Sequence, residues 1–133
     1  MNPQDFAALA AQDYNRIPVS LEVLADLETP ISAYRKLAEG PYSFLFESVQ
    51  GGEKWGRYSI IGLASRTRIK VFDHEVCLEQ DDEVVQRETV GDPLAWIERY
   101  LQSFKVAEPD SLPRFNGGLV GYFGYDTVSY IEP

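Results

Sequence analysis

The sequence predicts an α+β fold with a mixed, largely antiparallel sheet and about three helices. Two observations support this prediction. Segments of helical periodicity are interspersed with apolar stretches typical of strands, and most of the expected strands are joined by short turns. Because short turns reverse the chain direction, they favour antiparallel pairing over the long crossovers of a doubly wound sheet. The glycine-rich phosphate loops of nucleotide-binding α/β domains are also missing from the sequence.

Three segments carry helix start signals. The first helix is expected over residues 2–12, the second from Thr29-Pro30 to just before Gly40-Pro41, and the third from Asp92-Pro93. In the second and third, a side chain that can cap the helix precedes a proline that fits the first turn. Apolar spacing assigns these residues to the buried faces of the three helices: Phe6, Leu9, Ala10; Ile31, Tyr34, Leu37; Leu94, Ile97, Tyr100, Leu101, Phe104.

Strands are expected in the remaining apolar stretches, namely 42–49, 58–63, 68–72, 75–78, 83–87 and 117–125. The second and third of these could form one bent strand. The strands at 75–78 and 83–87 are expected to form a hairpin, whose acidic turn at 79–83 indicates a solvated loop. Residues 17–23 are expected to be extended at a sheet edge because they contain a proline.

Composition limits the possible functions. The chain has 133 residues, of which 44% are apolar, so it can bury the core of one domain. Its net charge of −9 argues against nucleic acid or an anionic membrane as a partner. No apolar run approaches the length of a membrane helix, and no secretory signal opens the chain.

Four single residues have plain structural interpretations. Cys77, the only cysteine, is expected in the core, and a chain without disulfides fits a reducing, cytoplasmic location. His74, the only histidine, is expected in a solvated turn, and one histidine with one cysteine makes no zinc site. Trp96 is expected in the core or at an interface, whereas Trp55 lies in a turn, where it could cover a ligand.

The stretch 44–62 is the most informative part of the sequence. It predicts two strands around a polar, glycine-rich turn, with Glu47 and Ser48 at one junction and Arg57, Tyr58 and Ser59 at the other. A turn that brings the strands together would place these groups near each other. A carboxylate suits an ammonium group, and an arginine or a hydroxyl suits a carboxylate, so a small zwitterion could bind there. A plain hairpin with solvated ends remains the alternative.

Two blocks of the sequence resemble a known family. Residues 44–48 (FLFES) with 56–62 (GRYSIIG) resemble the LLES…GRYS.IG signature in the N-terminal region of the anthranilate synthase large subunit, component I. Residues 117–126 (GGLVGYFGYD) are similar to the GG.VGY.GYD block that this family shares with sister enzymes using chorismate. The resemblance covers about residues 14–126. It implies that residues 1–133 form the N-terminal, tryptophan-regulatory part of a larger chorismate-utilising fold.

The resemblance also implies an activity for the whole enzyme. Such an enzyme is a carbon–oxygen lyase that converts chorismate and ammonia to anthranilate and pyruvate with magnesium, in tryptophan biosynthesis. A glutamine amidotransferase subunit, component II, supplies the ammonia, and L-tryptophan inhibits by feedback. The catalytic and magnesium-binding residues of the family lie in a region that this chain does not contain. Residues 1–133 alone are therefore expected to be inactive.

Six residues are expected at the effector site on the same basis. Ser48 matches the motif serine that hydrogen-bonds the bound tryptophan, and Glu47 matches the motif glutamate. Phe46 stands where the motif usually has leucine. Pro30 matches a proline that opens the helix next to the effector, and Arg57 and Tyr58 match polar groups across the pocket within one residue of register.

Two other functions are compatible with parts of the sequence. The same region of aminodeoxychorismate synthase component I shares the second block, but the fuller match of the first block favours anthranilate synthase. A stand-alone small-molecule binding domain is the other alternative. The apolar strand expected at 117–125, so close to the end of the sequence, counts against it, because a strand in that position suggests that the native protein continues.

Overall fold

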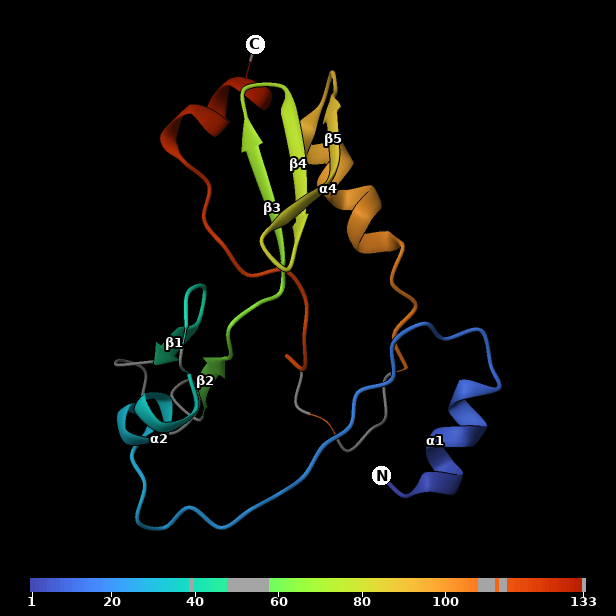
Figure 1. Cartoon of the computed structure of the whole chain (residues 1–133), viewed down its shortest axis with the longest axis vertical. Helices are drawn as coiled ribbons and strands as arrows, with labels where there is room; N and C mark the ends of the chain where they lie inside the picture. Colours follow the sequence, from blue (N-terminus) through green and yellow to red (C-terminus); the bar gives the residue numbers. More distant parts are fainter. Residues whose placement is uncertain (39, 48–57, 108–111, 113–114, 133) are drawn as a thin grey trace. The chain divides into compact units, whose positions relative to one another are not determined.

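The structure is a computed structural model that describes residues 1–38, 40–47, 58–107, 112 and 115–132. The chain divides into two compact units (Figure 1). Unit 1 comprises Met1–Glu22, Val71–Val76 and Thr89–Pro133, and unit 2 comprises Val23–Lys70 and Cys77–Glu88.

Unit 2 contains a two-stranded antiparallel sheet with a helix against it. Strand β1 (Phe44–Glu47) pairs with β2 (Ser59–Gly62), and helix α2 (Pro30–Leu37) contacts both strands (Figure 1). The pairing aligns Phe44 with Gly62 and Glu47 with Ser59. The expected pairing of the two strands of this region is therefore confirmed, and the expected turn between them lies outside the described residues.

A second sheet has three strands in the order β3 (Thr67–Phe72), β4 (Glu75–Gln80) and β5 (Glu83–Thr89). Its residues are divided between the two units. Two-residue turns join the strands, and φ is +53° at Asp73, +51° at Asp81 and +68° at Asp82. Aspartate tolerates this left-handed region better than most residues because its short side chain bonds locally. The two hairpins are antiparallel, so the expected α+β class is confirmed.

Unit 1 holds helix α1 (Pro3–Ala10), helix α4 (Pro93–Gln102) and the 3-10 helix η1 (Tyr125–Tyr130). The segment after α1 is joined to the segment after α4 through Asn15, whose side chain donates to the Ser103 carbonyl (2.7 Å) and accepts from the Lys105 amide (2.8 Å). Arg16 also forms a parallel bridge with Val106. These hydrogen bonds tie together residues almost ninety positions apart in the sequence.

The expected helix starts are confirmed. Thr29 and Ser32 form a reciprocal capping box at α2, and the Asp92 carboxylate accepts from the Ala95 amide (2.9 Å) at α4. The expected buried faces are only partly right. Ile31 and Leu37 on α2 are more than half exposed, and Leu101 on α4 is exposed. The buried face of α4 is instead centred on Trp96, which is 8% exposed and stacks on Tyr100. Trp96 therefore belongs to the core, as does Cys77, which is also buried.

The expected strand at 117–125 and the expected sheet-edge position of 17–23 are wrong. Residues 117–123 form no backbone hydrogen bond with another described segment, and residues 125–130 form a 3-10 helix instead. Residues 17–23 pair with no strand among the described residues, and the bridge of Arg16 with Val106 ends just before them. An apolar run becomes a strand only when a neighbouring strand accepts and donates its backbone hydrogen bonds. Both runs are apolar and exposed: Tyr122 is 93% exposed, and Leu21 is similarly open.

Candidate functional site

The candidate site lies at the end of β1 and the start of β2. Glu47 is the Cα partner of Ser59, and Phe46 is the partner of Ile60. Tyr58 directly precedes Ser59, so it belongs to the same end of the strand pair as Glu47. The structure therefore places Glu47, Tyr58 and Ser59 at the same end of the strand pair. These are three of the polar residues expected around a bound zwitterion. Ser48, Arg57 and Trp55 lie outside the described residues.

Phe46 is held by an aromatic pair on β1. The ring centroids of Phe44 and Phe46 are 4.7 Å apart, which is within contact distance for two phenyl rings. Across the sheet, the Phe44 ring covers Gly62 so closely that a Cβ atom there would come within 2.0 Å of the ring. Gly62 therefore makes room for Phe44, and Phe44 supports Phe46.

Gly62 stands in the first sequence block, but the sequence predicts no role for it. The available signal was an isolated glycine inside a strand pattern, which often marks a close approach of another group. In this structure the approaching group is the Phe44 ring.

The site end of β1 offers an apolar and an anionic group to solvent. Phe46 is 51% exposed, and the carboxylate of Glu47, which is also exposed, makes no hydrogen bond or ion pair with any other described residue. Successive residues of a strand point to opposite faces, so the Phe46 ring and the Glu47 carboxylate lie on the two faces of the same strand end. A ligand bound around this end would need both an apolar surface and a positive charge. Tyr58, on the partner strand, is exposed and adds a phenol that can donate or accept.

Helix α2 is the third element of the candidate site. Pro30 occupies its first turn, directly after the Thr29 cap. The Ser32 hydroxyl donates to Glu28 (2.6 Å), and Lys36 pairs with the same carboxylate. The hydrogen bond from Lys36 lowers the pKa of Glu28 below its usual value, with Ser32 adding to the effect. The polar groups at the start of α2 are therefore satisfied mainly by each other.

Charged residues on β3 and β4 and directly beside them form a separate cluster, which we call the hairpin cluster: Arg66, Arg68, Lys70, Glu79, Asp81 and Asp82. Arg68 bonds Glu79 (3.0 Å) and Asp82 (2.6 Å). The hydrogen bond from Lys70 lowers the pKa of Glu79, and that from Arg66 lowers the pKa of Asp81. The expected solvated acidic turn at 79–83 is therefore only partly right: Glu79 lies in β4 with its side chain 12% exposed, and Asp81 and Asp82 are paired with arginines.

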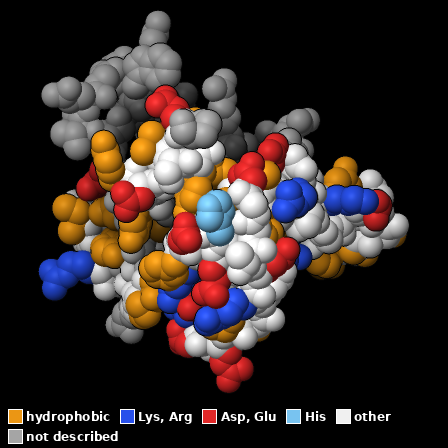
Figure 2. All heavy atoms as spheres, turned by 90° about the horizontal axis from the view of Figure 1, so that it is seen from above, with side chains coloured by type: hydrophobic (Ala, Val, Ile, Leu, Met, Phe, Trp, Pro, Cys, Tyr) orange, Lys and Arg blue, Asp and Glu red, His pale blue; other side chains and the backbone are white. Residues whose placement is uncertain are grey.

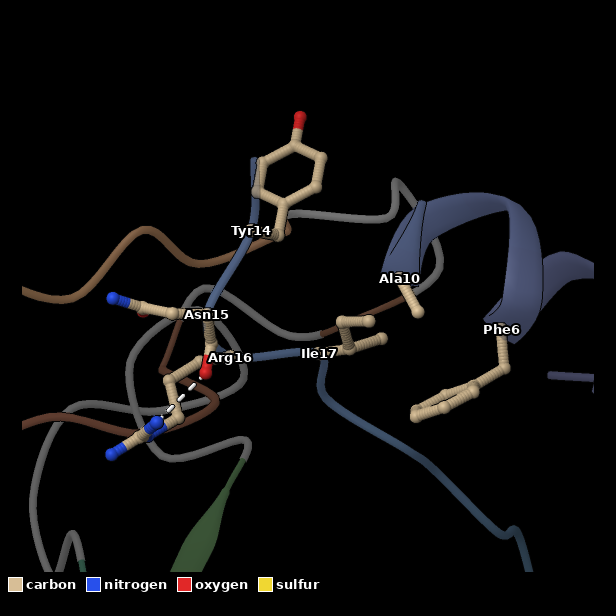
Figure 3. Close-up of a pocket in the computed structure, with 6 residues that line it drawn as sticks. All are labelled: Phe6, Ala10, Tyr14, Asn15, Arg16 and Ile17. Carbon is tan, nitrogen blue, oxygen red and sulfur yellow. Dashed lines mark hydrogen bonds between the residues drawn. The ribbon is translucent and has the colours of Figure 1, made fainter. Parts of the chain in front are cut away.

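Unit 1 contains an open hollow of about 240 Å³ (Figure 3). Phe6 and Ala10 of α1 and Ile17 lie on one side, and Asn15 and Arg16 lie on the other (Figure 3). The Arg16 guanidinium donates to the Asn15 carbonyl (2.7 Å) and lies over the Phe104 ring (4.8 Å). Arg16, the only cation among the described residues that line the hollow, is therefore already engaged in contacts within the fold. The hollow is a weaker candidate than the β1–β2 end.

His74 lies in the exposed β3–β4 turn, as expected (Figure 2). Its Nδ1 atom is 3.0 Å from the Val90 carbonyl, and its ring meets Tyr130 edge-on. On the face shown in Figure 2, basic side chains lie beside acidic ones. Within the described part of the chain there is no group of three potential metal ligands. None of the helices described here is long and apolar enough to cross a membrane.

Comparison with known proteins gives one consistent result. The chain is 56% identical over 132 residues to a protein of Pseudomonas aeruginosa named anthranilate synthase component 1. Proteins of the same name from Neisseria meningitidis serogroup B and Acetivibrio thermocellus are 51% and 45% identical. These matches cover 99%, 99% and 96% of this chain. The chain spans about a quarter of the length of these relatives, 26–27%. No family model and no solved structure matches it.

Proposed function

The chain is homologous to the N-terminal part of anthranilate synthase component 1, and we propose that it forms the tryptophan-binding regulatory region of such an enzyme. The effector site is placed at the β1–β2 end. Ser48, Glu47 and Arg57 bind the amino and carboxylate groups of L-tryptophan, and Phe46, Pro30 and Tyr58 border its indole ring.

The observation that supports this proposal best is the pairing of β1 with β2. It aligns Glu47 with Ser59 and leaves the Glu47 carboxylate without a partner among the described residues. The aromatic ring of Phe46 stands one residue away and is half exposed. A tryptophan site needs an apolar surface together with a few polar groups of opposite charge to the ligand, and these residue types meet at this end.

The proposal extends to the whole enzyme. The whole enzyme converts chorismate and ammonia to anthranilate and pyruvate. A glutamine amidotransferase, component II, supplies the ammonia in the cytoplasm. Magnesium assists the reaction in a region beyond residues 1–133, so we assign no residue of this chain to the metal. The chain alone has no turnover, and anthranilate fluorescence above background from chorismate, ammonium and magnesium would contradict this statement.

Inhibition follows from a two-state equilibrium. Tryptophan binds better to a state in which the catalytic region is incompetent, and so it shifts the population towards that state. The extent of the shift is limited by the difference between the two affinities. Substitutions at the β1–β2 end should therefore change inhibition and leave the uninhibited rate close to that of the wild type.

Ser48 provides the test. Hydrogen bonds to charged groups contribute roughly 1.5–3 kcal/mol, and about 1.4 kcal/mol is a factor of ten. In the complete enzyme, Ser48→Ala should raise the tryptophan concentration for half inhibition by about tenfold to a hundredfold, and Ser48→Phe should abolish inhibition by filling the slot. An unchanged half-inhibition value in Ser48→Ala would remove Ser48 from the site. A collapsed uninhibited rate would instead make Ser48 a structural or catalytic residue.

A further inference from the structure

Arg68 is the most constrained cation of the hairpin cluster. Its side chain is only 11% exposed. The guanidinium donates from Nε to Glu79 (3.0 Å) and from Nη2 to Asp82 (2.6 Å). Glu79 is itself only 12% exposed and receives a second hydrogen bond from Lys70 (2.8 Å). The guanidinium plane of Arg68 is therefore fixed by two carboxylates.

The ring of Tyr42 lies on this fixed plane. The Arg68 Cζ atom is 4.3 Å from the ring centroid, which is the geometry of a cation–π contact. Tyr42 has φ at +64°, a conformation that is unfavourable for a bulky residue and persists only where the surroundings hold it. The Arg68 contact is one interaction that can hold it.

The same short segment is attached to α2 on its other side. The hydroxyls of Ser43 and Tyr34 are 3.0 Å apart, and Ser43 also donates to the Gly40 carbonyl (3.3 Å). Strand β1 begins at the next residue and carries Phe46 and Glu47. Residues 42 and 43 thus connect β1 to two supports, the hairpin cluster and α2.

We propose that Arg68, acting through the ring of Tyr42, is a positioning residue that sets the direction of β1 and so orients Phe46 and Glu47 for the effector. This inference rests on the proposed tryptophan site. Arg68 contacts no ligand. Without it, Tyr42 loses one interaction that holds its left-handed backbone, and β1 samples orientations that bind the effector less well. The uninhibited reaction does not use this orientation.

The test compares two arginines of the same hairpin in the complete enzyme. Arg66 also makes a two-pronged ion pair, with Asp81 (2.5 and 2.7 Å), but its side chain is 79% exposed and no aromatic contact is described for it. Arg68→Ala should raise the half-inhibiting tryptophan concentration about threefold to tenfold. The matched control Arg66→Ala should leave that concentration within twofold. Neither change should alter the uninhibited rate.

A second pair of variants tests the aromatic contact without removing a charge. Tyr42→Phe keeps the ring and should retain wild-type inhibition. Tyr42→Leu removes the ring and should reproduce the shift of Arg68→Ala. Because Tyr42 is half exposed, these variants should fold even where Arg68→Ala does not, and the Tyr42 pair then decides the question.

The outcomes separate this inference from the proposed function. If the wild-type enzyme is not inhibited by tryptophan, the proposed function fails, and the positioning role fails with it. If the wild type is inhibited but Arg68→Ala and Tyr42→Leu respond as Arg66→Ala does, the positioning role is wrong and the effector site stands. Equal shifts in all three variants would also overturn it, because they would reflect general loss of stability.

Discussion

Charged side chains have opposite environments in the hairpin cluster and at the β1–β2 end. In the cluster, Arg68, Lys70 and Glu79 neutralise one another at hydrogen-bond distance and are at most partly exposed. At the β1–β2 end, the Glu47 carboxylate has no partner among the described residues and directly follows the half-exposed Phe46 in the strand. Both regions are short antiparallel pairs, so the fold type does not explain the contrast.

The contrast shows how structural charges differ from those available to a ligand. Paired charges lose part of their hydration and regain it from each other, so little attraction remains for a third group. A carboxylate at a strand end keeps its full capacity to bind a cation. Substitutions in the hairpin cluster should therefore change mainly the stability of the fold, whereas substitutions at the β1–β2 end should change mainly the inhibition by tryptophan.

The largest effect is expected from Gly62→Ala. The added methyl group would lie 2.0 Å from the Phe44 ring, so the ring must leave its position over the strand and its contact with Phe46. Overpacking of this kind costs about 1–3 kcal/mol. Urea unfolding should show a lower midpoint, and tryptophan inhibition should weaken as Phe46 moves.

Gly91→Ala is the matched control, since a methyl group there would have no neighbour within 4 Å among the described residues. Its stability should stay within about 0.5 kcal/mol of wild type. Equal destabilisation by the two substitutions would show that the Phe44 ring does not explain the need for Gly62; backbone entropy could not account for it either, because it favours alanine over glycine.

The next prediction sets Glu47 against Glu79. In the complete enzyme, Glu47→Gln should raise the half-inhibiting tryptophan concentration by about tenfold, because the neutral amide can still accept a hydrogen bond from the ammonium group but no longer pairs with its charge. It should leave the unfolding midpoint unchanged. Glu79→Gln should lower the midpoint, because it removes the shared partner of Arg68 and Lys70.

Two quantities are measured for this pair: the tryptophan concentration for half inhibition and the midpoint of urea unfolding. The proposed difference between the two regions would be wrong if Glu47→Gln destabilised the fold as much as Glu79→Gln and left the tryptophan inhibition unchanged. Glu47 would then be a structural residue whose partner lies outside the described part of the chain.

The sequence predicted the local features well and the tertiary ones poorly. Helix starts at Thr29 and Asp92 followed from cap residue and proline, which act within one turn. The hairpin at Asp81-Asp82 followed in the same way from local turn chemistry. In contrast, the segment 117–125 has the composition of a strand but not its pairing, because a strand depends on a partner that composition does not specify.

The candidate site was predicted to the same extent. The meeting of Glu47 with Ser59 followed from the polar groups at both ends of the turn. The roles of Phe44 over Gly62 and of Arg68 under Tyr42 depend on contacts between side chains from different strands and loops. No periodicity or local motif encodes such contacts, so they required the structure.

Smaller effects are expected from the helix caps. Thr29→Ala and Asp92→Ala each remove a side chain that accepts a backbone amide hydrogen bond, at 3.1 Å and 2.9 Å. Each should cost about 1 kcal/mol of stability by urea unfolding. Only Thr29→Ala should also weaken tryptophan inhibition, because Pro30 of the candidate site directly follows it. A similar change in inhibition with Asp92→Ala would mean that stability alone controls the effector response.

The smallest effect is a pH dependence that belongs to the hairpin cluster. The pKa of Glu79 is lowered from its ordinary value of 4.5, first by the hydrogen bond from Lys70, and that of Asp81 is lowered from 3.8 by Arg66. A carboxyl group with a lower pKa in the folded state contributes stability that is fully present above its ordinary pKa. This contribution is lost as the pH falls through the lowered value.

The urea midpoint should therefore stay level from pH 7 down to about 5 and then decline as these carboxylates take up protons. Glu79→Gln has no proton to gain at that position, so its midpoint should start lower at pH 7 and decline less steeply below pH 5. Arg66→Ala should flatten the curve in the same way through Asp81, but by less, because this pair is more exposed and water screens its attraction. A wild-type slope in both variants would place the acid-sensitive carboxylates outside the hairpin cluster, and the contrast with the β1–β2 end would lose its electrostatic basis.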